Sequence, residues 1–196
     1  MGIDTKTLAQ LRESTGAGLS DCQTALREAD GKIDQAIEIL RKKGAVKAAK
    51  KISERSANEG LVGSYIHSNG KIGVLVDLRC ETDFVARNDE FKELARDLAM
   101  QIAAVNPLYL KPEDVPESEV AKEKEIYQEQ LKTEGKPENV WEKIIDGKLN
   151  KYYEGVCLLK QPFIKDDKLT IEQLISGKIA KIGEKIEVIK FIRYQI

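Results

Sequence analysis

Apolar residues in the first forty positions recur at intervals of three and four, which places them along one face of an α-helix. We predict three short helices that bury these stripes against one another as a small bundle. Asp4 or Thr5 is expected to cap the first helix, Ser20 the second, and Gly44 is expected to end the third. The three stripes are Leu8 and Leu11, then Cys22, Ala25 and Leu26, then Ile33, Ala36, Ile37 and Leu40.

From about residue 61 the pattern changes to the alternation that is typical of half-buried strands. Residues 61–67 and 72–80 alternate in this way and flank Asn69-Gly70, which is a strong hairpin signal. A last alternating segment closes the chain at 186–194. Helical spacing returns in the segments between: 89–105, 117–134, 137–149 and a helix that begins after Thr170. We therefore predict an α+β protein whose three-stranded antiparallel sheet is covered by helices.

These changes of pattern divide the chain into a three-helix domain (1–44), a basic helical linker (45–59) and an α+β core (60–196). The linker is rich in alanine and carries Lys47, Lys50, Lys51 and Arg55. In the core, residues 118–132 consist mostly of Glu and Lys with few apolar positions. That pattern is typical of a solvated arm or of one half of a helical hairpin.

The composition argues against a membrane-spanning protein and against one that binds nucleic acid through its overall charge. The chain has 196 residues, of which 41% are hydrophobic, and no apolar run approaches the length of a membrane span. No basic and apolar leader opens the chain, so we expect a cytoplasmic protein. The net charge of −1 is too small to attract the whole protein electrostatically to nucleic acid or to acidic membranes.

The three cysteines are far apart and form no C-x-x-C pair, which argues against a zinc site and against a disulfide framework. We expect three small buried side chains, no bound metal and no cofactor.

No catalytic constellation stands out. His67 is the only histidine, and general acid–base chemistry would need a positioned partner that the spacing does not supply. Cys80, Glu81 and Asp83 are candidate partners, but a surface or interface histidine is favoured, and we do not expect an enzyme. The basic stretch 41–55 could contact phosphates, yet it lacks aromatic residues for base stacking. A solvated helix face is favoured over a nucleic-acid site.

A short segment, Thr82 to Arg87, joins the second strand to the following helix, and Phe84 lies at its centre between Asp83 and Arg87. A phenylalanine on such a turn either folds back onto the core or contacts a partner. Spacing alone favours the core.

Several segments together resemble the bacterial elongation factor Ts family, in order and over nearly the whole chain. They are Leu11–Cys22, Gly44–Lys51, Cys80–Asn88, Gln161–Phe163 and Phe191–Tyr194. The resemblance implies a guanine nucleotide exchange factor for elongation factor Tu, with an N-terminal domain like the ubiquitin-associated fold. It also implies that Thr82, Asp83, Phe84 and Val85 displace Mg²⁺ in the partner and that Phe84 wedges between partner helices. Arg12 and His67 are possible additional partner contacts.

Many family members have a duplicated core, whereas this chain has strands for a single sheet. A short form of this kind is expected to form a symmetric homodimer with a second copy. Three alternatives remain open. They are a polypeptide-binding adaptor that uses the three-helix domain, an RNA-binding protein that uses residues 41–55, and an enzyme that uses His67 with Cys80.

Overall fold

The computed structural model describes residues 4–196, although within residues 45–54 the side chains of only Val46 and Ala48 are described. The basic side chains predicted at Lys47, Lys50 and Lys51 therefore lie outside the described residues. The chain forms two compact units. The first unit contains the residues up to Leu61 together with Leu78–Lys92 and Gln173–Ile189. The second contains Val62–Asp77, Glu93–Glu172 and Lys190–Ile196.

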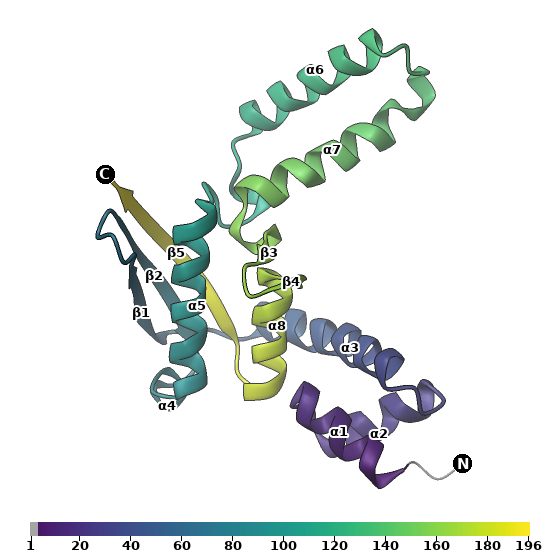
Figure 1. Cartoon of the computed structure of the whole chain (residues 1–196), viewed down its shortest axis with the longest axis vertical. Helices are drawn as coiled ribbons and strands as arrows, with labels where there is room; N and C mark the ends of the chain where they lie inside the picture. Colours follow the sequence, from purple (N-terminus) through teal and green to yellow (C-terminus); the bar gives the residue numbers. More distant parts are fainter. Residues whose placement is uncertain (1–3) are drawn as a thin grey trace. The chain divides into compact units, whose positions relative to one another are not determined.

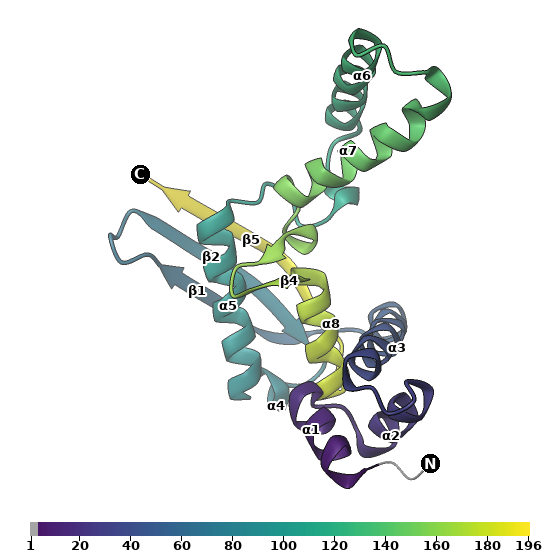
Figure 2. The ribbon, with the colours of Figure 1, turned by 45° about the vertical axis from the view of Figure 1, so that its right-hand side comes forward.

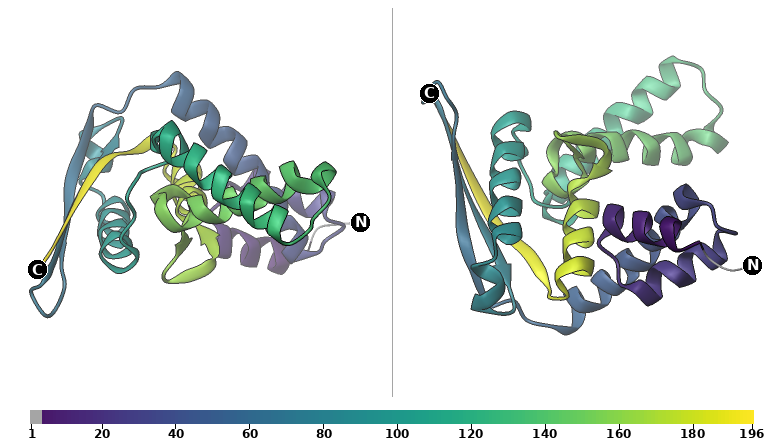
Figure 3. Two further views of the ribbon diagram at one scale, coloured as in Figure 1. Left: turned by 90° about the horizontal axis from the view of Figure 1, so that it is seen from above. Right: turned by 60° about the horizontal axis from the view of Figure 1, so that its bottom comes forward.

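The first unit opens with the expected three helices, α1 (Thr5–Thr15), α2 (Leu19–Glu28) and α3 (Ile33–Glu54) (Figure 3). Their inward faces pack into one apolar core of Leu8, Leu11, Cys22, Ala25, Leu26, Ala29 and Ala36. The carboxylate of Asp4 accepts a hydrogen bond from the backbone N–H of Lys6 at 3.3 Å, which confirms the predicted cap of α1.

Two predicted helix boundaries in the first unit are wrong. Helix α2 begins at Leu19 with Gly18 as its N-cap, because the extended Gly18 carbonyl already accepts from the N–H of Cys22; Ser20 is therefore inside the helix. Helix α3 also continues through Gly44 instead of ending there. Gly44 lies against α8 (Ile171–Ile182), where a Cβ would be 3.6 Å from the Cβ of Ala180, so this glycine serves close packing within a helix.

The main sheet has the predicted three antiparallel strands, β1 (Glu59–Ile66), β2 (Ile72–Cys80) and β5 (Ile186–Gln195), in the order β1-β2-β5. The Asn69-Gly70 hairpin is confirmed: the N–H of His67 donates to the carbonyl of Ile72 at 2.9 Å, and Gly70 has φ 68°.

Helix α5 (Asp89–Val105), whose bounds agree with the prediction, runs along one face of the sheet (Figure 2). Gly63 permits this approach, since a Cβ there would lie 2.9 Å from the Cβ of Ala95. Within the second unit the opposite face of the sheet carries no helix (Figure 3).

Helices α6 (Glu117–Thr133) and α7 (Trp141–Val156) form an antiparallel hairpin in the second unit (Figure 1). The hairpin has its own small core around Leu131, Ile145 and Leu149. Residues 118–132 are therefore half of a helical hairpin. Helix α7 begins later than the predicted residue 137, because the 3₁₀ helix η2 (Glu138–Val140) follows Pro137, and it continues past the predicted end at residue 149 to Val156. Two more 3₁₀ helices are η1 (Pro112–Asp114) and η3 (Leu158–Lys160).

A small two-stranded sheet, β3 (Pro162–Phe163) with β4 (Asp166–Thr170), was not predicted. It is connected to α5 through two fully buried glutamines. The Gln101 side-chain amide donates to the side-chain oxygen of Gln161 at 3.2 Å and to the carbonyl of Pro162 at 3.1 Å. Its own oxygen accepts from the N–H of Ile164 at 2.9 Å. The polar atoms of this buried network therefore have partners.

Candidate functional site

The segment Thr82–Val85 leaves β2 and forms a single helical turn, α4 (Asp83–Ala86). Thr82 is the N-cap of this turn, with extended backbone, and its hydroxyl oxygen accepts from the N–H of Val85 at 3.4 Å. This side-chain cap lies within the segment itself and satisfies one of the free backbone N–H groups of the turn. The sequence pattern did not predict this turn as a helix, because four residues are too few to show a period.

Adjacent side chains on this turn have opposite surroundings. Val85 is 6% exposed and anchors the turn to the first unit, whereas Phe84 is 79% exposed. A large aromatic side chain with this exposure does not pack on its own core, so the interpretation that spacing alone favoured is wrong for the isolated chain. Asp83 and Arg87 form an ion pair at 3.0 Å beside Phe84, and both side chains are exposed. An exposed pair of this kind contributes little to stability.

Glu184, in the turn between α8 and β5, holds Thr82 with both carboxylate oxygens. The backbone N–H of Thr82 donates to Oε2 at 3.1 Å, and its hydroxyl donates to Oε1 at 2.7 Å. The thiol of the buried Cys80 donates to the carbonyl oxygen of Thr82 at 3.1 Å. The pKa of Cys80 is raised to about 11, chiefly by burial and then by the charge of Glu184, so the thiol keeps its proton at neutral pH.

The neighbouring acid, Glu81, also contacts the turn between α8 and β5. Its Oε1 accepts from the backbone N–H of Lys185 at 2.6 Å and lies 3.1 Å from Nη1 of Arg55, which follows α3. The sequence suggested Glu81 only as a partner for His67, and it gave no indication of Glu184, since a charged residue near a turn shows no periodic signal for its partner.

The other candidate residues lie elsewhere. Arg12 is exposed on α1, in the first unit. His67 is exposed in the second unit, where its Nδ1 is 3.1 Å from the hydroxyl of Tyr65. Nucleophilic chemistry at Cys80 would need a thiolate, and its raised pKa disfavours that form. The geometry therefore gives no support to an enzyme that uses His67 with Cys80.

All three cysteines are free and buried, as expected. Within residues 4–196, His, Cys, Asp and Glu side chains form no group of three or more that could hold a metal ion. Over the same range no helix combines the length and apolar character needed to cross a membrane.

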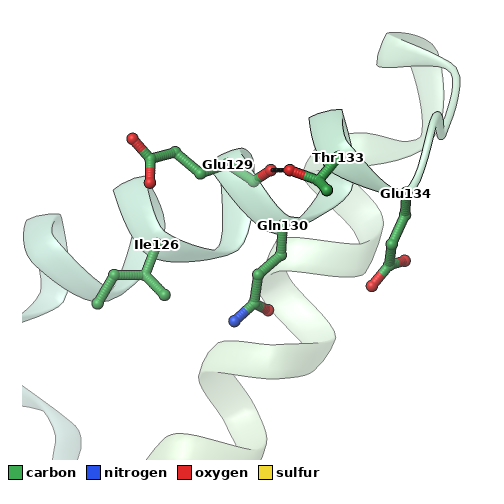
Figure 4. A pocket seen from close by; sticks show the side chains of 5 residues that line it. All are labelled: Ile126, Glu129, Gln130, Thr133 and Glu134. Carbon is green, nitrogen blue, oxygen red and sulfur yellow. Dashed lines mark hydrogen bonds between the residues drawn. The ribbon is translucent and has the colours of Figure 1, made fainter.

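The helical hairpin has a shallow hollow of about 360 Å³ along α6, lined by Ile126, Glu129, Gln130, Thr133 and Glu134 (Figure 4). The hydroxyl of Thr133 donates to the carbonyl of Glu129 at 2.9 Å, so the proton of this hydroxyl is already used in a hydrogen bond within α6. All five residues come from one helix and its end, and the side-chain oxygen of Gln130 already accepts a hydrogen bond from Nζ of Lys148 on α7 at 2.6 Å. This hollow lacks the convergent groups of a ligand site.

An α+β fold that presents one exposed aromatic side chain on a capped, anchored turn is suited to a factor that acts by binding another protein. A profile of the family described as Elongation factor TS matches residues 4–196. The chain is 53% identical over 196 residues to Elongation factor Ts of Maridesulfovibrio salexigens, covering 100% of this chain and 95% of that protein. It is 56% identical over 196 residues to Elongation factor Ts of Fervidobacterium nodosum, covering 100% and 99%.

The chain therefore belongs to the elongation factor Ts family, the nucleotide exchange factors for elongation factor Tu. It acts in translation elongation as an exchange factor rather than as a catalyst of covalent chemistry.

Proposed function

We propose that Thr82–Val85 is the segment through which this chain acts on elongation factor Tu bound to GDP. Phe84 inserts between helices of the partner, the segment loosens Mg²⁺ and GDP, and the nucleotide-free state is stabilised until GTP enters. The observation that carries this proposal is the 79% exposure of Phe84 beside the buried anchor Val85. Burial of this exposed aromatic side chain by a partner would yield about 1.5–3 kcal/mol.

The energetic requirement follows from linkage. The GTPase holds GDP through backbone donors of its phosphate loop and through a Mg²⁺ ion that bridges phosphate oxygens. A factor that bound the loaded and empty forms equally well would not shift this equilibrium. The contact of Phe84 must therefore be stronger in the nucleotide-free form, and by reciprocity GDP must weaken the binding of the factor by the same ratio.

The capped turn supports this role because it is ordered before the partner arrives. Binding loses affinity when loops must be ordered at the interface. The cap at Thr82 and the burial of Val85 hold α4 in one conformation in the free chain. Phe84 is then presented at low entropic cost.

The test is release of a fluorescent GDP analogue from elongation factor Tu, with wild-type chain and with Phe84→Ala. We expect wild type to accelerate release and Phe84→Ala to lose most of that acceleration. Leu108→Ala is a matched control, since Leu108 is also a large exposed apolar residue, at 62%, in the second unit. Equal acceleration by wild type and Phe84→Ala would exclude the proposed role of the segment.

Arg12 and His67 are the further partner contacts that we propose, within a functional division into a ubiquitin-associated-like domain (1–44), a linker (45–59) and a core (60–196). The exposure of both side chains leaves them free to reach a partner. Arg12→Ala and His67→Ala should each weaken binding of elongation factor Tu while the melting temperature stays constant. An unchanged dissociation constant for a variant would remove that residue from the interface.

The uncovered face of the sheet supports a homodimer. In the second unit Val62, Ile66, Leu75, Ile192 and Tyr194 are large apolar or aromatic residues with exposures between 44% and 67%. A second copy can cover such an apolar sheet face by sheet-on-sheet packing about a two-fold axis. Light scattering should give twice the monomer mass at micromolar concentration, and Leu75→Lys should shift it toward the monomer. A monomer mass for the wild type would refute the homodimer.

As a translation factor the chain is expected to act in the cytoplasm. Fractionation of cells that produce the tagged chain would test the location.

A further inference from the structure

We propose that Glu184 is the residue that positions the Thr82–Val85 segment for its action on elongation factor Tu. This inference rests on the function proposed for that segment. Glu184 is 102 residues from Thr82 in sequence, and it belongs to the turn that joins α8 to β5.

The two hydrogen bonds from Thr82 determine how its hydroxyl is oriented. The hydroxyl proton is directed to Oε1 of Glu184, at 2.7 Å, so a lone pair of the same oxygen is free to face α4. That lone pair accepts from the N–H of Val85 at 3.4 Å. Glu184 thus selects the hydroxyl rotamer that caps the turn which carries Phe84.

The polar atoms of Thr82 are all held, although the residue itself is exposed. Its N–H and hydroxyl donate to Glu184, and its carbonyl oxygen accepts from the thiol of Cys80 at 3.1 Å. Hydrogen bonds to a carboxylate are shorter and stronger than those between neutral groups. A surface residue with this set of partners is positioned more firmly than the turn alone would require.

The segment after β2 and the turn between α8 and β5 form hydrogen bonds in both directions. Glu184 accepts from the backbone N–H of Thr82, and Glu81, which precedes Thr82, accepts from the backbone N–H of Lys185, which follows Glu184, at 2.6 Å. Each acid therefore binds the amide next to the other acid. Arg55 adds a third connection, since its Nη1 donates to Glu81 and also to the carbonyl of Gly183 at 3.5 Å.

Loss of Glu184 should loosen the segment without unfolding the chain. The N–H and hydroxyl of Thr82 are exposed, so water can replace the carboxylate at small cost to stability. Binding would then have to fix the backbone of Thr82 again, at an entropic cost. For the ordering of this one residue we expect exchange to slow by roughly tenfold.

The experiment measures GDP-analogue release over a range of concentrations of full-length factor for wild type, Phe84→Ala, Glu184→Ala and the double variant. Glu172→Ala is the control, because it removes a carboxylate that pairs with Lys160 at 2.8 Å and does not contact Thr82. We expect Glu184→Ala to slow release about tenfold, Glu172→Ala to match wild type, and the double variant to be no slower than Phe84→Ala. Glu184→Gln keeps one acceptor oxygen and should fall between Glu184→Ala and wild type.

A second readout is independent of exchange activity. In Glu184→Ala the backbone amides of residues 82–87 should exchange hydrogen faster, while the melting temperature stays within about two degrees of wild type. Unchanged protection of these amides would overturn the positioning role.

The kinetic outcomes separate the two proposals. Normal release with Glu184→Ala and slow release with Phe84→Ala would overturn the role of Glu184 and leave that of the segment in place. Multiplied effects in the double variant would mean that Glu184 acts independently of Phe84, which also overturns positioning. Normal release with Phe84→Ala would instead overturn the proposed function of the segment.

Discussion

Phe84 and Val85 are adjacent in sequence, and their substitutions should separate binding from stability. Val85 is 6% exposed, so Val85→Ala removes two buried methyl groups at about 0.8 kcal/mol each and leaves a cavity. We expect the free energy of unfolding to fall by about 1.5–3 kcal/mol. For a chain of this length that corresponds to a drop of roughly 3–12 °C in the melting temperature.

Phe84→Ala should leave stability nearly unchanged and slow nucleotide exchange. Because the side chain is 79% exposed, its removal should change the free energy of unfolding by less than about 0.5 kcal/mol. Full burial of a phenylalanine yields about 1.5–3 kcal/mol. The exposed 79% leaves about 1.2–2.4 kcal/mol of that for a partner, which corresponds to roughly 8- to 60-fold in exchange.

Two assays on the same samples decide the matter: thermal unfolding by circular dichroism, and release of the GDP analogue well below the lower melting temperature. The expected pattern is a destabilised but active Val85→Ala and a stable but slow Phe84→Ala. If Phe84→Ala lowered the melting temperature as far as Val85→Ala, the aromatic side chain would pack on its own chain in solution. A loss of exchange below about twofold would mean that partner burial of Phe84 contributes almost nothing.

Three further predictions follow from the packing of the fold. Gln101→Leu should lower the free energy of unfolding by about 2–4 kcal/mol, because it leaves the N–H of Ile164 and two acceptors without their partner. Urea titrations would measure this, and a change below about 0.5 kcal/mol would contradict it. Burial raises the pKa of Cys80 and of Cys157 from 9.0 to about 11. The unfolded thiols therefore lose protons first, and stability should fall between pH 9 and 11 by at most about 3 kcal/mol per thiol, less steeply in a variant with both cysteines replaced by alanine. Gly60→Ala should destabilise the chain by at least about 2 kcal/mol in the same titrations, because Gly60 has φ 150° and a Cβ there would lie 2.2 Å from the carbonyl oxygen of Leu78; an unchanged midpoint would refute this.

The elements that local chemistry specifies were predicted from the sequence. The Asn69-Gly70 turn needs a positive φ that glycine adopts at no cost, and Gly70 has φ 68°. Helix α5 shows a clear apolar stripe, and its bounds, Asp89 to Val105, match the prediction. Gly44 was misjudged because a glycine that ends a helix and a glycine that admits a neighbouring helix look the same in one sequence.

The candidate site depends on long-range pairings that no local pattern encodes. The contact between Thr82 and Glu184 joins residues 102 positions apart, and Gln101 meets Gln161 across 60 positions. The direction of Phe84 is likewise a tertiary property. Periodicity favoured the core for this side chain, and only the resemblance to a family, which reflects many residues at once, pointed to a partner.

The energetics of Phe84 also limit what the segment can do alone. A gain of roughly 8- to 60-fold is the upper range for one side chain that is already partly covered, so faster exchange requires further contacts. The first unit offers a route for them, since Arg55, at the end of the connection from α3, pairs with Glu81 directly before Thr82. Lys181 of α8 adds a second connection, because it pairs with Glu90 of α5 and lies against Gly16 in the loop after α1. If the partner contacts the N-terminal helices as proposed for Arg12, these pairings would connect those contacts with the turn that carries Phe84. On this reasoning, Arg55→Ala should make the effects of Arg12→Ala and Phe84→Ala more nearly independent, whereas in the wild-type background they should be coupled.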